Sequence, residues 1–302
     1  MIIFVLAIVM AAGSTVMADY PDDVIEFTVP WSPGGGSDTL MRITANYLSD
    51  ELGVDIVIHN RPGASGTMGL REHLDEPNDG YYIGQVHEGL IVAHHTGVTD
   101  LNFDDFDYVG GITNSPQYLA VSNDLPSDFD EFVEYAQNNQ IHVGTTMAGI
   151  PHAQLAMLEE AIDANFNYVG YEGTGERVEG LAGGHVDAIV VDYASGYEYV
   201  EGGYFQFIAA ATEERTDDLP DLETFQELGV DVTWNIVRSI TVPPGTDADR
   251  VAVLEEALGN VAENPEFQED ITNAGAEVFF MTSEELTEYY TEFDELVEEL
   301  GM

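Results

Sequence analysis

The first strongly patterned stretch of the chain is a strand, a glycine turn and a helix in succession. Ile25, Phe27 and Val29 alternate with polar residues, which predicts a strand. From residue 40 to residue 52 the apolar side chains return at helical spacing, which predicts a helix with one buried face. The turn between them, residues 32–38, needs glycine's freedom at φ and ends in an N-cap residue. Backbone N–H groups at such a helix start converge on one point and favour an anion.

The same succession returns three more times along the chain. The later turns, at 60–67, 145–151 and 172–175, are also rich in Gly, Ser and Thr. The runs 186–191 and 205–211 are apolar except for Asp187 and Gln206, which is typical of strands buried on both faces of a parallel sheet. In open α/β sheets, ligands bind at the carboxyl ends of the strands. The pattern therefore predicts an α/β fold with one cleft, lined by helix starts from two lobes.

We expect the chain to cross between the lobes near residues 113 and 240. The first lobe would then comprise 19–113 plus 240–302, and the second lobe 114–239.

The last helix has its own start signal. Thr282 and Glu285 have the spacing of a capping box, in which each side chain binds the backbone of the other residue. We interpret the apolar and aromatic residues on one side of this helix as core: Leu286, Tyr289, Tyr290, Phe293, Leu296 and Val297.

Acidic residues dominate the composition. The chain has 57 Asp and Glu against seven arginines and no lysine, so its formal net charge at pH 7 is −50. A folded chain with this charge repels itself strongly at low salt, whereas at about 1 M salt the screening length falls to about 3 Å. We therefore interpret the protein as halophilic and assign most carboxylates to the solvated surface. Nucleic acid is excluded as a partner, because seven arginines cannot form a basic patch against this charge.

Cysteine is absent, which excludes disulfides, thiol catalysis and thiolate metal sites. It also excludes the anchor of a lipoprotein. The first twelve residues are almost entirely apolar, and Val16-Met17-Ala18 has the small-residue spacing of a signal-peptide cleavage site, although a basic start is missing. Residues 1–18 are therefore expected to be a signal peptide or a short N-terminal anchor. Either would place the mature chain outside the cytoplasm.

Several short motifs occur in a fixed order along the chain. They are Tyr20-Pro21, Pro30-Trp31-Ser32-Pro33-Gly34-Gly35-Gly36-Ser37-Asp38, Asn60 to Gly69, Asp79-Gly80-Tyr81, Thr145 to His152, Gly170-Tyr171-Glu172-Gly173, Leu181 to Asp187, and Arg238 through Thr246. In this order and spacing, the chain resembles the extracytoplasmic solute receptors of tripartite tricarboxylate transporters, also called Bug receptors. The resemblance covers nearly the whole mature length.

The resemblance implies a two-lobed periplasmic-binding-protein fold of type II, a Venus flytrap that closes on its ligand. It also implies that the protein captures a small carboxylate, such as a di- or tricarboxylate, and delivers it to the membrane subunits of a transporter. Catalysis and a cofactor are not expected. The first two turns would grip one carboxylate through backbone N–H groups and hydroxyls, and turns of the second lobe would select the rest of the ligand.

The candidate ligand-binding residues follow from this assignment. Asp192 ends a strand of the second lobe and could accept a hydrogen bond from an amino or hydroxyl group of the ligand. The complete set is Ser32, Gly35, Gly36, Ser37, Asp38, Ala64, Ser65, Gly66, Thr67, Thr146, Gly149, His152, Gly173, Thr174 and Asp192.

Three departures from the receptor pattern bear on specificity. Gly149 stands where a hydroxyl residue is common, and Gly170 replaces a frequent proline. His87 and Glu88 follow a strand where small neutral residues are usual. A glutamate facing a bound carboxylate would repel it, so either Glu88 points away or the ligand is not a plain dicarboxylate.

Three alternatives remain open. An enzyme is disfavoured, because no phosphate-loop lysine, G-x-S-x-G elbow or H-E-x-x-H motif occurs. A metal-binding receptor would draw on His87, Glu88, His94 and His95, although adjacent strand residues point to opposite faces. A sensor or scaffold on the same fold, or a receptor for a ligand that is not a carboxylate, also fits the pattern.

Two further side chains have two interpretations each. Arg238 lies in an extended, otherwise apolar segment near the expected hinge, where it would either serve function or pair with a surface carboxylate. His152 would either cap or pack against its helix, or donate a hydrogen bond toward the cleft.

Overall fold

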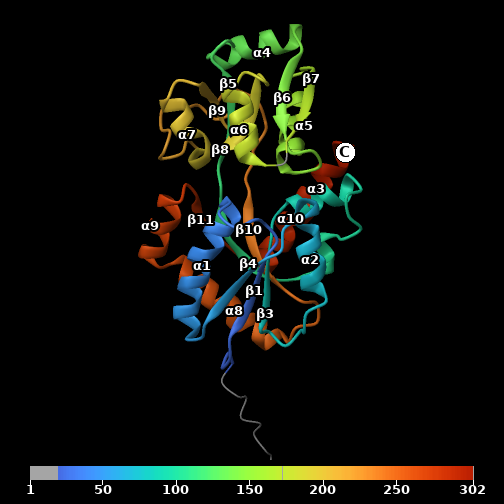
Figure 1. Cartoon of the computed structure of the whole chain (residues 1–302), viewed down its shortest axis with the longest axis vertical. Helices are drawn as coiled ribbons and strands as arrows, with labels where there is room; N and C mark the ends of the chain where they lie inside the picture. Colours follow the sequence, from blue (N-terminus) through green and yellow to red (C-terminus); the bar gives the residue numbers. More distant parts are fainter. Residues whose placement is uncertain (1–19, 172, 302) are drawn as a thin grey trace, which may run out of the picture.

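The computed structural model describes residues 20–171 and 173–301 (Figure 1). Two separate β-sheets, each covered by helices, form two lobes stacked along the long axis of the molecule. The expected signal peptide or anchor, residues 1–18, lies outside the described residues. Within the described ranges, none of the helices has the length and apolar character needed to cross a membrane.

Lobe 1 is built on a six-stranded sheet with the strand order β11-β4-β10-β3-β1-β2. Its strands are β1 (Ile25–Val29), β2 (Ile56–Asn60), β3 (Tyr82–Val86), β4 (Asp107–Asn114), β10 (Val237–Val242) and β11 (Glu277–Thr282). Its α-helices are α1 (Gly36–Leu52), α2 (Thr67–Leu74), α3 (Gly89–His95), α8 (Ala248–Ala262), α9 (Pro265–Asn273) and α10 (Ser283–Glu299), and short 3-10 turns occupy η1 (Ala64–Gly66) and η2 (Phe103–Asp105). β1 runs parallel to β2 and β3, whereas β10 runs antiparallel to β3 and β4.

Lobe 2 is built on a five-stranded sheet with the strand order β7-β6-β8-β5-β9. Its strands are β5 (Gln117–Ser122), β6 (Ile141–Thr145), β7 (Phe166–Gly170), β8 (Ala188–Asp192) and β9 (Phe205–Ala210). Its helices are α4 (Phe129–Asn138), α5 (Ile150–Ala161), α6 (Thr174–Ala182) and α7 (Tyr193–Glu201). β6 runs parallel to β7 and β8, and β5 runs antiparallel to β8 and β9.

The prediction of a parallel strand is wrong for β9, which pairs antiparallel with β5 at the edge of the sheet. Both faces of β9 are nevertheless covered. Phe205 packs in a buried cluster with Leu181, and Ala209 packs in another with Trp234. A largely apolar run therefore indicates burial on two faces, and the direction of the strand does not follow from it.

The chain crosses between the two sheets at 115–116, between β4 and β5, and at 235–236, after Trp234 of the lobe 2 core and before β10. β10 begins at Val237 and pairs with β3 and β4. Residues 237–239, which the sequence pattern assigns to the second lobe, therefore belong to the sheet of lobe 1. We propose the two joining segments as the lobe boundaries.

The predicted helices form as their patterns require. Leu40 and Leu48 of α1 are buried in one core cluster with Phe27 of β1, and the helix ends where Gly53 adopts a left-handed φ of 71°. At α10 the capping box is confirmed, because Thr282 and Glu285 bind each other's backbone N–H groups.

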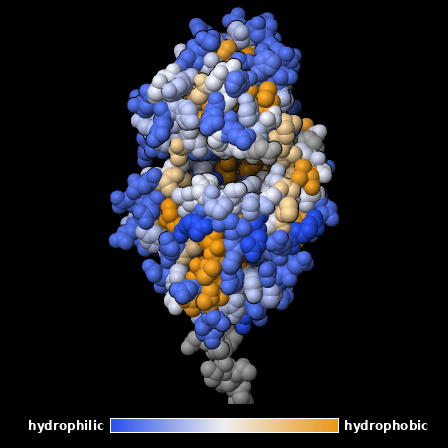
Figure 2. All heavy atoms as spheres, viewed as in Figure 1, coloured by the Kyte–Doolittle hydropathy of each residue, from blue (hydrophilic) through white to orange (hydrophobic). Residues whose placement is uncertain are grey.

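The lobes touch at both ends of the hollow that separates them (Figure 2). At one end, α5 of lobe 2 packs on α3 of lobe 1, and Ala153 joins a buried cluster that contains Leu90. At the other end, Gly275 lies so close to α7 that a Cβ placed on it would be 2.5 Å from the Cβ of Ala194. The two lobes are therefore in contact on both sides of this hollow.

Candidate functional site

The first glycine turn follows β1 and opens α1 at the edge of the lobe 1 sheet. Gly35 is the N-cap residue and has no side chain that could accept a hydrogen bond from the helix start. The first N–H groups of α1 therefore stay available to an external acceptor. Gly36 and Ser37 face a cation, because Arg238 Nη2 lies 3.5 Å from the position that a Cβ on Gly36 would take.

Asp38 joins the first turn to the second. Its side chain is only 3% exposed, and it accepts hydrogen bonds from Gly34 N at 2.8 Å, Arg42 Nε at 3.0 Å and Asn60 Nδ2 at 2.8 Å. Burial raises the pKa of Asp38, but these hydrogen bonds outweigh burial and hold the pKa below its usual range. We infer that this residue, predicted to bind ligand directly, positions the turns instead.

The second turn lies beside the first, because β1 and β2 are paired with Val29 opposite Asn60. Four consecutive residues, 63–66, have left-handed φ angles of 138°, 47°, 56° and 86°. Two of them, Ala64 and Ser65, carry side chains, so the backbone of this turn is strained. The Thr67 hydroxyl donates to the Ala64 carbonyl at 2.8 Å and holds the turn together. Strain of this kind is typical of binding sites.

Arg238 is the principal cation of the site in lobe 1. Its side chain is only 6% exposed, and it donates from Nε to Ser37 Oγ at 3.0 Å and from Nη1 to Ser115 Oγ at 2.7 Å. Among the described residues, none places a carboxylate within ion-pair distance of it. Burial lowers the pKa of Arg238 to about 10, against the charges of Asp192 and Glu88, so it stays cationic at neutral pH. Surface pairing, one of its two interpretations, is therefore wrong.

A second buried arginine, Arg177 of α6, organises the turns of lobe 2. Its side chain is 4% exposed, and it donates to Thr146 Oγ1 at 2.9 Å and to Thr174 Oγ1 at 3.3 Å. It therefore connects the turn before α5 with the start of α6. Burial lowers its pKa to about 10, and the negative charge of Asp192 opposes this. No sequence motif singles out Arg177, although an arginine just after a glycine turn is a usable signal in a chain with seven arginines.

Asp192 lies within electrostatic reach of both buried arginines. It caps α7, accepting from Ser195 N at 2.9 Å and Ser195 Oγ at 3.0 Å. Its carboxylate therefore already has local donors, and a ligand contact from it remains a proposal.

The remaining predicted site residues occupy three kinds of position. Ser32 is exposed on the first turn, and Ser65 is half-buried on the second. Gly149 and Gly173 are the N-cap residues of α5 and α6 and, like Gly35, supply no capping side chain. His152 accepts weakly from Ala148 N at 3.4 Å and packs edge-on against Tyr168, which fits the capping and packing interpretation.

The Glu88 side chain points away from the glycine turns and into lobe 1. Its Oε1 accepts from Val237 N at 2.9 Å and from the Tyr289 hydroxyl at 2.7 Å, and the side chain is fully buried. Burial raises its pKa to about 7. The repulsion that a glutamate would exert in the cleft is therefore avoided.

The other histidines considered for a metal have protein partners. His94 binds the Leu101 carbonyl at 2.9 Å, and His95 binds Asp294 at 2.8 Å. In the described ranges, no group of three or more His, Asp or Glu side chains is arranged to hold a metal ion.

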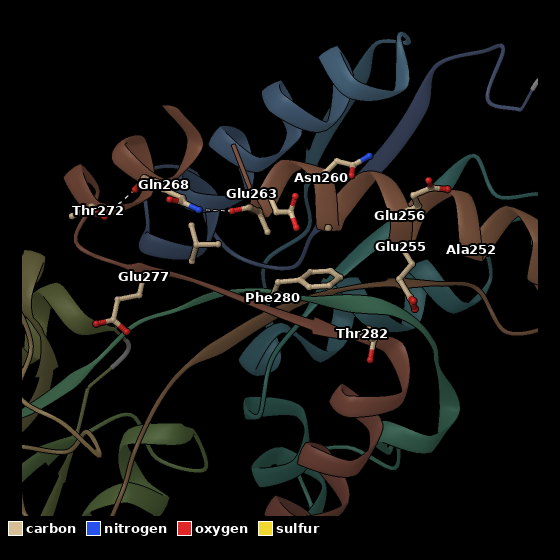
Figure 3. Close-up of a pocket in the computed structure, with 13 residues that line it drawn as sticks. Ala252, Glu255, Glu256, Asn260, Glu263, Gln268, Thr272, Glu277, Phe280 and Thr282 are labelled. Carbon is tan, nitrogen blue, oxygen red and sulfur yellow. Dashed lines mark hydrogen bonds between the residues drawn. The ribbon is translucent and has the colours of Figure 1, made fainter. Parts of the chain in front are cut away.

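A separate groove of about 750 Å³ lies between α8, α9 and β11 (Figure 3). Four glutamates line it, Glu255, Glu256, Glu263 and Glu277, and the Phe280 ring lies over its middle. No arginine lines this groove. Its charge makes it unsuited to an anion, so the hollow between the lobes is the better candidate site.

Known proteins share this fold and about a quarter of this sequence. An UPF0065 protein of Cupriavidus necator, from the gbd 5' region, is 26% identical over 94% of this chain and 89% of its own. A solute-binding protein from Polaromonas, solved without ligand, is 25% identical, with a TM-score of 0.80 over 93% of this chain and 98% of its own. MatC from Rhodopseudomonas palustris, solved with bound malate, is 23% identical, with a TM-score of 0.79 over 94% of this chain and all of its own.

The family assignment rests on a match of residues 40–300 to the tripartite tricarboxylate transporter family receptor. That range contains the second turn, both buried arginines and all of lobe 2. Proteins of this family bind solutes and are not enzymes, which confirms the expectation of no catalytic role. The chain belongs to the receptor family of the tripartite tricarboxylate transporters.

Proposed function

We propose that this protein is an extracytoplasmic receptor that captures a small carboxylate, such as a di- or tricarboxylate, for a tripartite tricarboxylate-type transporter. The observation that carries the proposal is Arg238, a buried cation that has no carboxylate partner among the described residues and that touches Ser37 at the start of α1. A bound carboxylate would supply the missing negative charge and would accept from the uncapped N–H groups of the same turn.

The turns of lobe 2 would bind the distal part of the ligand. Arg177 holds the hydroxyls of Thr146 and Thr174 in place, and Gly149 and Gly173 leave two more helix starts open. A ligand with a second anionic or polar end would therefore contact both lobes. Such a ligand favours the closed arrangement, because only that arrangement offers both sets of contacts at once.

Relatives of known structure support the proposed location and the proposed ligand class. Solved structures of the same fold include the periplasmic binding protein BugD, 26% identical to this chain, and MatC with bound malate. These proteins support a location outside the cytoplasm and a carboxylate ligand for this receptor.

The test is thermal denaturation in high salt with a panel of organic anions that includes succinate, malate, citrate and acidic amino acids. A ligand present at one hundred times its Kd is expected to raise Tm by about 5 °C. In the variant Arg238→Gln the affinity should fall roughly 10- to 100-fold, so at the same ligand concentration the shift should shrink to about half or less of the wild-type shift.

Arg215→Gln is the matched control, because Arg215 pairs with Glu227 on the surface of lobe 2. It should bind like the wild type. Absence of a shift with every anion of the panel would overturn the proposed function, and an unchanged affinity in Arg238→Gln would remove that arginine from it.

A further inference from the structure

His87 occupies a position between the first glycine turn and lobe 2. It follows the last residue of β3 and stacks on the Trp31 ring, with centroids 4.7 Å apart and planes 10° apart. Trp31 follows β1, the parallel neighbour of β3, so both rings lie at the carboxyl edge of the sheet. The His87 side chain keeps some exposed surface, whereas the core histidine His73 is fully buried.

The ring packs closely on Gly89 and reaches the neighbourhood of α5. A Cβ placed on Gly89 would lie 2.6 Å from His87 Cε1 and 3.6 Å from the side chain of Ile150, the first residue of α5. Only glycine at position 89 therefore leaves room for this orientation of the ring. The imidazole is held at the junction of the turns of both lobes.

One hydrogen bond fixes which ring nitrogen carries the proton. The Gly89 N–H donates to His87 Nδ1 at 2.9 Å, so Nδ1 acts as an acceptor. In a neutral imidazole the other nitrogen, Nε2, then carries the proton and is a donor. Among the described residues, no acceptor is hydrogen-bonded to Nε2.

The surroundings keep the ring neutral. Burial is the main cause that lowers the pKa of His87 to about 3, and the charge of Arg238 acts in the same direction. The ring lies at the same edge of the sheet as the first glycine turn, where the carboxylate is proposed to bind. His87 therefore offers an N–H donor without a charge.

We propose that His87 is a ligand-binding residue, whose Nε2–H donates to an oxygen of the carboxylate ligand that Arg238 and the first glycine turn hold. The inference rests on the proposed function. It gives this receptor a specificity element at a position where the resemblance leads one to expect small neutral residues. A ligand whose group at this point is a cationic amine would be rejected, because such a group offers no acceptor.

Three variants separate the donor from the rest of the ring. His87→Asn keeps a side-chain acceptor for Gly89 N but removes the donor at the Nε2 position. His87→Gln places an amide N–H near that position, and His87→Phe keeps the stack on Trp31 without any polar atom. His185→Phe, on the surface of lobe 2, is the control. Binding of malate and succinate is measured by calorimetry in high salt.

We expect His87→Asn and His87→Phe to weaken binding by roughly 10-fold or more, with His87→Gln and the control close to the wild type. Weaker binding of both ligands identifies a carboxylate oxygen as the acceptor, and weaker binding of malate alone identifies the malate hydroxyl. Wild-type affinity in His87→Asn would overturn the inference, as would equal losses in all three variants, which indicate a structural role. A wild type that binds neither acid overturns the proposed function, and the inference with it.

A second measurement does not depend on how the variants fold. In wild-type protein labelled with ¹⁵N at histidine, His87 should appear as the neutral Nε2–H tautomer at pH 5. Its Nε2 resonance should move when malate is added. An Nδ1–H tautomer, or a resonance that stays fixed at saturating malate, would contradict the proposal.

Discussion

Six of the seven arginines of this receptor fall into two groups with different partners, and the difference carries the functional interpretation; the seventh, Arg250, lies over the rings of Tyr20 and Tyr81. Arg42, Arg61, Arg71 and Arg215 pair with carboxylates, as expected in a chain with 57 acidic residues. Arg177 and Arg238 are buried and bind hydroxyl and carbonyl oxygens instead. Asp192 acts electrostatically on both, but among the described residues none of the ion pairs includes either arginine. A buried cation without a directly paired anion is costly, and a bound anion would offset that cost.

Glu88 is expected to make the stability of the protein depend on pH. Burial raises its pKa from 4.5 to about 7 in the folded protein, so between these values the folded state holds a proton that the unfolded state releases. The contribution of Glu88 to the free energy of unfolding is therefore fully present at low pH. It is lost as the pH rises through about 7, and the total loss is about 3 kcal/mol. Glu88→Gln should remove this loss and should be more stable than the wild type at pH 8.

The measurement is the free energy of unfolding of both proteins from pH 4.5 to pH 8 at constant salt. Gln keeps an oxygen for Val237 N and the Tyr289 hydroxyl, so the two hydrogen bonds of Glu88 are retained. The other carboxylates cancel in the difference between the two proteins. A difference that stays constant with pH would show that folding does not raise the pKa of Glu88.

In the second turn, one hydroxyl is expected to act in ligand binding and another in holding the fold of the turn. The Thr67 hydroxyl is used inside the turn, by its bond to the Ala64 carbonyl, whereas Ser65 has a half-buried side chain on the same turn. We expect Ser65→Ala to weaken ligand binding with little change in Tm. Thr67→Ala should lower stability by about 1 kcal/mol and also weaken binding, because the strained turn loses its internal bond.

Calorimetry and thermal denaturation of the two variants check this prediction. Thr96→Ala is a control for the hydroxyl, since Thr96 donates to the Val92 carbonyl at the end of α3 and not in a glycine turn. A Ser65→Ala variant with wild-type affinity would place that hydroxyl outside the site.

Local elements could be predicted from the sequence, but the side chains that meet across elements could not. Local residues determine the turns before α1 and α2 and the capping box at Thr282, so their patterns can be recognised in the sequence. That Arg238 meets Ser37, 201 positions away, depends on β10 crossing back into lobe 1. For the same reason, the inward orientation of Asp38 and the bonds of Arg177 were not predicted. Such contacts are set by packing between elements, which no local pattern encodes.

At the scale of the molecule, closure brings acidic surfaces together. Glu277 of β11 and Asp218 of lobe 2 both have raised pKa values, mainly from burial and additionally from neighbouring carboxylates. Asp217 and Asp218 act on Glu277 across the boundary between the lobes. Concentrated salt screens this repulsion. A net charge of −50 is therefore compatible with a receptor that closes, provided that it works in salt.

Gly275 provides the test of closure. A Cβ at this position would lie 2.5 Å from the Cβ of Ala194, so Gly275→Ala should hold the lobes apart at the α7 end. We expect malate affinity to fall at least 10-fold and the radius of gyration from small-angle X-ray scattering, measured with malate, to exceed that of the wild type.

Gly275 also has a left-handed φ of 75°, so alanine adds strain of about 1 kcal/mol that is unrelated to closure. Gly53→Ala controls for this strain, because Gly53 has a φ of 71° and open space around it. Equal affinities of the two variants would mean that contact between Gly275 and Ala194 is not needed for the ligand-bound state.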